Sequence, residues 1–364
     1  MAFESGTTAL IPCTLTGKMP KDFLKRLAQY SAGKLDDVRD EPAFGWVSGR
    51  HLLESEINET TAVFGGHLYV NLRKAERKIP AQLLNAICRR EELAYMQAND
   101  TMVVPKKEKK RIKEDAIERN LMKMPPTISA IPIAVDMATN MLYVGSSSLK
   151  AFDLAAAEFL KAMEIEPIPV NIRELMLKYF KKSEIDLPDV SFNGRPSSEP
   201  TPGRDFLTWL WYFSETRNGL LKVENLGNFN LIIEGPLTFA INGDDLPGAS
   251  ESTVKKGCPQ MSAEAKASLA VGKKLRKAKI LLARGDAEKW TFTFDADMFT
   301  FSSLSLPETE SMEINTRFEE RILSLNVFLT AFEAYFQKFA SDIMAAKPAV
   351  LKDIVQWASD RESL

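Results

Sequence analysis

The residues of this 364-residue chain that could perform chemistry are few and widely separated. His51 and His67 are the only histidines, so a zinc site would have to join them with distant cysteines or carboxylates. Asp295 and Asp297 lie two residues apart in FDADMF; on a β-strand they would share one face and could hold Mg²⁺ for phosphodiester cleavage. Such a pair more often belongs to a solvated strand face, so a nuclease is an alternative rather than the main prediction.

Familiar catalytic motifs are absent from the sequence. No GxxxxGK[ST], GxGxxG, HExxH or GxSxG pattern occurs, which argues against the corresponding nucleotide-binding, metalloprotease and hydrolase chemistry. Cys13, Cys88 and Cys258 are far apart and form no CxxC pair, as is typical of a reducing compartment. With no signal-peptide pattern and no apolar run of about 20 residues, we predict a cytoplasmic, membrane-free protein without catalytic activity, cofactor or metal.

Positive charge is concentrated in two parts of a chain whose formal net charge is only -2. Residues 255–284 contain nine basic residues and a single acidic one, Glu264. Residues 73–123 contain fourteen basic and eight acidic residues, whereas residues 286–364 contain seven basic and fourteen acidic ones. The near-neutral total therefore conceals a divided distribution of charge.

The stretch VGKKLRKAKILLAR, residues 271–284, has six basic side chains and no acidic one. We predict that Ser262 caps a helix that continues to about Ala278, with an apolar face and an opposite row of lysines. The lysines of that row are Lys266, Lys273 and Lys277. Carboxylates four residues away, which would neutralise the row, are missing, so the sequence predicts unpaired cations that a polyanion could meet.

A second basic block, PKKEKKRIK at residues 105–113, begins a predicted helix. Cations at a helix N-terminus oppose the helix dipole, and a bound polyanion would offset that cost. Apolar residues recur at helical spacing from Pro80 onward, and the chain turns through NDTMVVP before the second helix. We therefore predict an antiparallel helical hairpin over residues 80–123.

Duplex DNA is the polyanion that these two blocks suit best, because each neutralised phosphate releases counterions and adds affinity. The cations are not interleaved with aromatic residues, which argues against stacking on single strands, and no base-reading motif is present. Sequence preference should therefore be weak. The candidate DNA-binding residues from this charge pattern are Lys106, Lys107, Lys109, Lys110, Arg111, Lys266, Lys273, Lys274, Arg276, Lys277 and Lys279.

Clustered strands and helices predict an α+β fold with largely antiparallel curved sheets, covering helices and a projecting helical hairpin. The predicted parts are a central α+β domain over residues 1–79 and 124–185, the hairpin tip over 80–123, a Pro- and Ser-rich linker or loop insertion over 186–205, and a C-terminal α+β domain with a helical tail over 206–364. The aromatic stretch FLTWLWYF, residues 206–213, is expected in a core or a dimer interface.

The order of these features resembles the bacterial recombination-associated RdgC family. The motifs that carry the resemblance are FGWV, VNLRKAERKIP, the hairpin ending KKEKKRIKEDAIERNLMKMPP, VGKKLRK and TRFEERILSL, and together they extend over most of residues 10–340. The resemblance implies a non-enzymatic protein that encircles duplex DNA as a homodimeric ring with little sequence preference and restrains RecA-mediated recombination. Its implied partners are duplex DNA, a second copy of the chain and, by competition for DNA, RecA, in a nucleoid-associated location.

The resemblance also implies where DNA would contact the ring. In the family the hairpin tip meets its mate and basic residues line the hole. By position, the residues lining it here would be Arg73, Lys74, Arg77, Lys78, Lys273, Lys274 and Lys277.

Two other functions stay open from the sequence. One is the Mg²⁺-dependent nuclease based on Asp295 and Asp297. The other is an assembly or scaffold protein that binds no nucleic acid, in which the basic blocks of one subunit dock on the acidic carboxy-terminal region of another.

Overall fold

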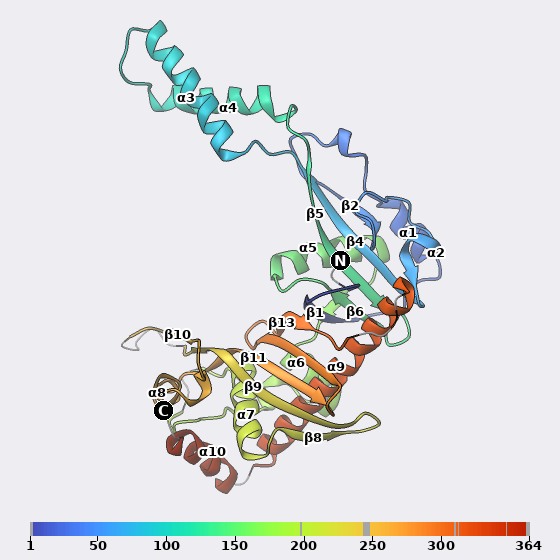
Figure 1. The fold of residues 1–364 in the computed structure, drawn as a ribbon, viewed down its shortest axis with the longest axis vertical. Helices are drawn as coiled ribbons and strands as arrows, with labels where there is room; N and C mark the ends of the chain where they lie inside the picture. The colour runs from blue at the N-terminus through green and yellow to red at the C-terminus, as the bar shows by residue number, and fades with distance from the viewer. Residues whose placement is uncertain are drawn as a thin grey trace. The chain divides into compact units, whose positions relative to one another are not determined.

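The computed structural model describes residues 3–196, 199–242, 248–308, 311, 313–346 and 348–361 and shows an α+β fold with mainly antiparallel strand pairs (Figure 1). The predicted α+β class and its largely antiparallel strand pairing are confirmed. The chain divides into two compact units. The larger unit comprises Met1–Met19, Phe64–Leu68 and Ala134–Leu364, and the smaller comprises Pro20–Val63 and Tyr69–Ile133.

The larger unit is built on an open antiparallel sheet. Its strands are β1 (Thr8–Leu15), β6 (Met141–Val144), β7 (Pro167–Pro169), β8 (Leu220–Val223), β9 (Gly227–Ala240), β10 (Glu251–Val254), β11 (Lys274–Arg284), β12 (Glu288–Asp295) and β13 (Thr300–Ser305). They follow the order β10-β9-β11-β12-β13-β1-β6, with β8 added to β9 and β7 to β1. The register places Lys279 of β11 between Glu234 of β9 and Thr293 of β12.

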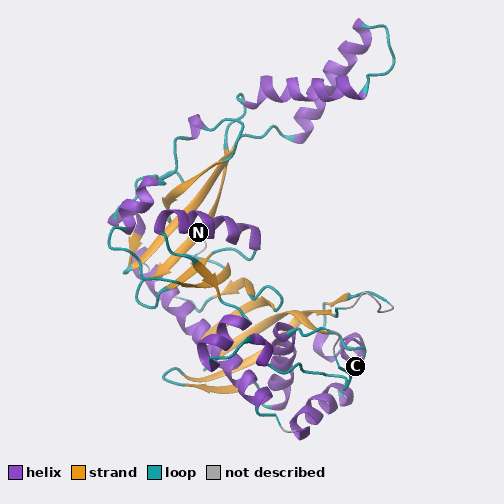
Figure 2. Ribbon diagram, turned by 180° about the vertical axis from the view of Figure 1, so that it is seen from behind, coloured by secondary structure: helices purple, strands orange, loops and turns teal. Residues whose placement is uncertain are grey.

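Helices cover one face of the strands β9, β11 and β12, and Figure 2 shows helices of the larger unit gathered beside its strands. The helices of this unit are α5 (Leu149–Met163), α6 (Ile172–Phe180), α7 (Pro202–Thr216), α8 (Ala263–Ala270), α9 (Ile314–Met344) and α10 (Pro348–Asp360), with short 3₁₀ turns at Glu184–Asp186 and Pro259–Met261. No helix in the described ranges is both long enough and apolar enough to cross a membrane.

Aromatic packing holds α7 and α9 against the sheet. The ring of Phe206 on α7 lies 5.5 Å from the rings of Phe332 and Phe336 on α9 and 6.3 Å from Phe294 on β12. Because these rings are fully buried, they remove a large apolar area from water and fix both helices on the sheet. The stretch FLTWLWYF is therefore part of a core, one of the two places expected for it.

The smaller unit contains short strands and the predicted helical hairpin. Its elements are α1 (Phe23–Gln29), a 3₁₀ turn at Leu35–Asp37, β2 (Ala43–Ser48), α2 (Glu59–Ala62), α3 (Ala81–Ala98) and α4 (Lys106–Leu121). Three strands, β3 (Val63–Phe64), β4 (His67–Glu76) and β5 (Thr127–Asp136), contribute residues to both units. Strand β2 pairs antiparallel with β4 and places Trp46, which is fully buried, opposite Leu72.

The hairpin of α3 and α4, called the helical arm below, has little core of its own. No described side chain of α3 is buried, and α4 buries only Ile112 and Ala116. In the loop between the helices, Met102 is 94% exposed and Val103 is 71% exposed. The arm therefore presents most of its side chains, apolar ones included, to solvent.

The predicted helix from Ser262 to about Ala278 is wrong at its end. Ser262 does cap a helix, since its hydroxyl accepts a hydrogen bond from the Ala265 amide at 3.1 Å, but α8 stops at Ala270. Gly272 adopts a φ of 91°, a left-handed conformation that ends helices and favours glycine. Beyond it, buried residues alternate with partly exposed ones, the two-residue period of a strand, and the chain continues as β11.

Candidate nucleic-acid interface

The cations of residues 271–284 are paired, contrary to the expectation from the sequence. Five of the six form ion pairs with carboxylates, and the sixth, Lys273, donates to the Ser252 hydroxyl at 3.3 Å. The paired residues are Lys274, Arg276, Lys277, Lys279 and Arg284. Most of the carboxylates come from segments far away in the sequence, so a search for acids four residues away could not find them. The predicted lysine row on a helix is therefore wrong both in its helical placement and in its lack of partners.

Lys274 lies inside the larger unit, where it forms a buried charge cluster. Its ammonium group lies 2.9 Å from the Asp189 carboxylate and contacts Asp205, and the whole residue is only 5% exposed. Burial raises the pKa of the Asp205 carboxyl to about 7, while the charge of Lys274 acts in the opposite direction. Lys274 therefore stabilises the fold, and its ammonium group is not accessible to a phosphate.

Arg276 lies among three carboxylates at the start of β11. It pairs with Glu251, and its Nε lies 3.2 Å from Asp297 while its Nη2 lies 3.9 Å from Asp295. Although partial burial disfavours the charged form, these carboxylates raise the pKa of the Arg276 guanidinium. The positive charge of this residue is therefore largely compensated within the chain.

Lys266 is engaged at the carboxy-terminal helix. Its ammonium group donates to the backbone carbonyl of Arg361 at 2.7 Å. The Arg361 guanidinium itself lies 3.9 Å from the centre of the Trp211 ring and pairs with Glu215. These contacts fix the end of α10 against α7, and Lys266 stabilises this arrangement through its hydrogen bond to Arg361.

The arginines of β4 and its extension are used to hold loops of the smaller unit. Arg73 is 4% exposed and donates to the backbone carbonyls of Leu52 and Gly33. Arg77 donates from Nε to the carbonyl of Val38 at 2.7 Å and also bonds the carbonyl of Met124. Because their guanidinium groups already donate to backbone carbonyls, Arg73 and Arg77 have few N–H donors left for a phosphate.

The two lysines of the same segment differ from each other. The ammonium group of Lys74 lies 2.7 Å from the carboxylate of Glu76, on the same strand. Lys78 is exposed and forms no ion pair with a described residue. Of the four candidates at residues 73–78, Lys78 is thus the most accessible to a phosphate.

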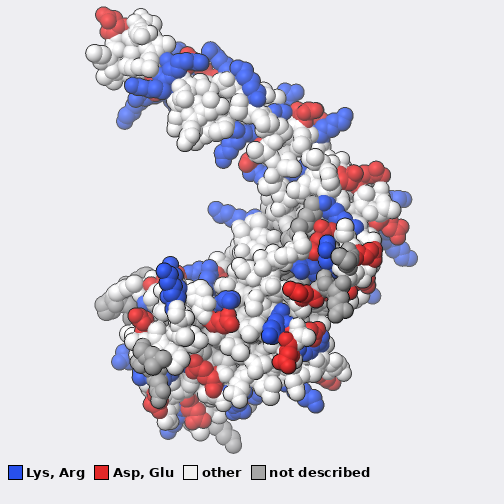
Figure 3. All heavy atoms as spheres, viewed as in Figure 1, with Lys and Arg blue, Asp and Glu red and all other residues white. Residues whose placement is uncertain are grey.

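The first two turns of α4 carry the most accessible cations of the predicted set. We call these residues the arm surface: Lys106, Lys107, Lys109, Lys110, Arg111 and Lys113. All six are exposed, and Figure 3 shows Lys and Arg side chains gathered over the helical arm. Lys113 was missing from the candidate residues, although it belongs to the same basic block.

Few carboxylates neutralise the arm surface. Arg111 pairs with Glu108 at 2.8 Å and Lys110 with Glu114 at 3.6 Å. Within the described chain, no ion pair is formed by Lys106, Lys107, Lys109 and Lys113. Glu108 is the sole acid in the first turn, and no side chain caps the helix, so the positive end of the helix dipole adds to the field of these lysines.

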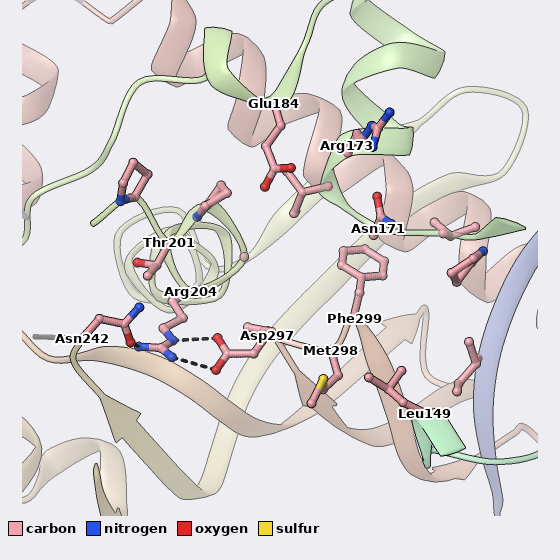
Figure 4. Close-up of a pocket in the computed structure, with 18 residues that line it drawn as sticks. Leu149, Asn171, Arg173, Glu184, Thr201, Arg204, Asn242, Asp297, Met298 and Phe299 are labelled. Atoms are coloured by element: carbon pink, nitrogen blue, oxygen red, sulfur yellow. Dashed lines mark hydrogen bonds and ion pairs between the residues drawn. The ribbon is translucent and has the colours of Figure 1, made fainter. Parts of the chain in front are cut away.

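Asp295 and Asp297 do not lie on one strand, as the nuclease alternative supposed. Asp295 is the last residue of β12, and Asp297 lies in the turn that follows. Figure 4 shows Asp297 at the edge of a pocket of about 530 Å³, where the Arg204 guanidinium holds both of its oxygens at 2.6 and 2.7 Å. Asp295 accepts from Lys277 at 2.9 Å. Cations thus occupy the oxygens that would bind Mg²⁺, and no described group of three His, Cys, Asp or Glu residues is arranged to hold a metal.

These features define an α+β protein with a cationic helical arm. Residues 19–178 match the model of a known family, described as "Putative exonuclease, RdgC". This part of the chain, which includes the whole helical arm, is an RdgC family domain, and the resemblance noted in the sequence is confirmed over that range. At family level this domain supports a recombination-associated DNA-binding role. No curated protein matches the chain.

Proposed function

We propose that this protein binds double-stranded DNA without sequence preference, mainly through contacts between DNA phosphates and the arm surface. The observation that carries the proposal is the group of exposed lysines on the first two turns of α4, four of which have no carboxylate partner among the described residues. A lysine without a carboxylate partner can meet a phosphate without first breaking an ion pair. Each such contact releases counterions from the DNA and contributes affinity. The absence of aromatic residues between these lysines favours duplex over single-stranded DNA.

We also propose that two copies form a ring around the duplex and restrain RecA by competing for DNA on the nucleoid. The RdgC family domain and the wider resemblance of the sequence support this arrangement. The exposed Met102 and Val103 in the loop of the arm offer an apolar contact for the arm of a second copy. A closed ring would keep the protein on DNA topologically, so a few phosphate contacts would suffice.

The proposed protein is not an enzyme and requires no cofactor. In support, Arg204, Arg276 and Lys277 engage Asp295 and Asp297, the pair that a Mg²⁺-dependent nuclease would need. Displacing these cations would leave charges unpaired in a partly buried site, which is costly.

Electrophoretic mobility shifts over a series of salt concentrations test the proposal. We expect two duplexes of unrelated sequence to bind equally, a single strand to bind more weakly, and affinity to fall as salt rises. A chain that forms dimers but retards neither duplex would instead favour an assembly protein without nucleic acid.

A further inference from the structure

The larger unit carries a second group of cations on the open face of its sheet. We propose that Arg276, Lys277 and Lys279, called the β11 strip, form a second contact surface for the phosphates of duplex DNA. We further propose that Glu234 and Glu251 hold this surface in a neutralised state. The inference rests on the proposed DNA binding and adds to it a mechanism that limits affinity.

The pleat of β11 presents the strip to solvent. Ala278, Ile280 and Leu282 face the core and are fully buried, so Lys277 and Lys279 project from the opposite face. Their side chains are 41% and 43% exposed. Two residues along a strand span about 6.7 Å, a spacing at which two ammonium groups can meet neighbouring phosphates of one DNA strand.

The carboxylates around the strip are of two kinds. Asp295 is built into the fold, since it pairs with Lys277 and also accepts a hydrogen bond from the Asp297 amide at 3.1 Å. Asp297 is held in turn by the bidentate pair with Arg204. These two residues shape the turn between β12 and β13, so their charges are a fixed part of the surface.

Glu234 and Glu251 differ because each pairs with one cation of the strip and has no other partner among the described contacts. Glu234 lies 2.8 Å from the ammonium group of Lys279, and Glu251 pairs with Arg276. Their side chains are 36% and 46% exposed. Ion pairs this exposed contribute little to stability, so either carboxylate can swing away at small cost to the fold.

A carboxylate in such a place competes with phosphate. It carries the same sign of charge, accepts the same N–H donors, and would repel a phosphate that approached the strip. A DNA strand can displace both glutamates together because it brings several phosphates and releases their counterions at once. Glu234 and Glu251 therefore weaken binding without abolishing it, which would favour movement of the protein along DNA.

The test is the double variant Glu234→Gln/Glu251→Gln, compared with wild type by duplex titration over a salt series. Each freed cation raises affinity by up to about eight-fold at 0.1 M salt and the salt slope by about 0.9. We expect the variant to bind between about ten-fold and about 60-fold tighter, with a steeper slope. The matched control is Glu158→Gln/Asp342→Asn, which removes two partly exposed, lysine-paired carboxylates elsewhere in the same unit and should change affinity less than about two-fold.

Adding Arg276→Gln and Lys279→Gln to the double variant removes the two released cations and should return the affinity to the wild-type level. If wild type binds DNA but the double variant matches the control, the restraint by these glutamates is refuted while the arm surface stands. The role of the strip is also refuted if tighter binding survives the loss of both Arg276 and Lys279. If neither wild type nor any variant binds, the proposed function fails together with this inference.

Discussion

Neutralising the arm surface should lower the affinity for DNA without lowering the stability of the fold. The perturbation is Lys106→Gln/Lys107→Gln/Lys109→Gln, which removes three of the cations that have no described carboxylate partner. Glutamine keeps much of the side-chain length and a good helix propensity. Because it also removes positive charge near the N-terminal end of the α4 dipole, the free energy of unfolding should stay level or rise.

The expected loss of affinity follows from the number of contacts. If each lysine neutralises one phosphate, the slope of log affinity against log salt falls by about 0.9 per residue, or about 2.7 for the triple variant. At 0.1 M salt this corresponds to a loss of up to about 500-fold, equal for duplexes of different sequence.

The assay is a titration of labelled duplex over a salt series, followed by thermal melting of each protein. The control, Lys150→Gln/Lys222→Gln/Lys352→Gln, removes the same charge from exposed lysines of the larger unit and should lower the slope far less. An unchanged slope in the arm variant, or equal losses in both variants, would show that the arm surface does not bind phosphate and that net charge alone sets affinity.

Three further predictions concern the buried charges and the aspartate pair. Lys274→Met should lower the free energy of unfolding by about 3–5 kcal/mol, because it leaves Asp205 buried without its cation; a denaturant titration that shows no loss would contradict the buried pairing. Burial raises the pKa of Asp205 to about 7, so the folded chain binds this proton more tightly than the unfolded chain, and stability should fall as pH rises from about 4 to 7. Asp205→Asn should flatten that part of the pH profile, and an unaltered profile would exclude this carboxyl as its source. Plasmid DNA incubated with Mg²⁺ should remain intact, whereas cleavage that Asp295→Ala abolishes would restore the nuclease alternative.

The sequence predicted the parts of the molecule whose signals are local. The helical arm followed from apolar spacing and from the turn NDTMVVP, and the capping role of Ser262 followed from its place before AEAKASLA. The aromatic stretch on α7 was expected in a core because large rings are rarely left in water. Each of these depends on residues within a few positions of one another.

The pairing of β11 could not be predicted in the same way. Ala267, Val271, Leu275 and Ala278 fit a helical face, yet Gly272 interrupts the helix, and the alternation at Ala278, Ile280 and Leu282 is that of a strand. Once the segment is a strand, its neighbours are β9 and β12, which bring Glu234 and Asp295 to the lysines. Cross-strand partners depend on register, and register depends on the whole sheet.

The same limit applies to Arg73 and Arg77. Both occur in a basic segment, but their donors bond backbone carbonyls of loops tens of residues away. A count of charges along the chain cannot distinguish a guanidinium that holds a loop from one that is free to meet DNA. The exposure of a cation and its contacts within the chain distinguish these two cases. By both criteria the lysines of the arm surface are the better candidates for DNA contacts.

Site-specific photo-crosslinking tests the central claim most directly. A photoreactive residue would replace Lys107 on the arm surface or, as a control, the exposed Lys352 on α10, and each protein would be irradiated with a duplex of arbitrary sequence. The account predicts a strong DNA adduct from position 107, lost at high salt, and little or none from position 352. Crosslinking at position 352 alone, or at neither position under conditions where the protein retards the duplex, would contradict it.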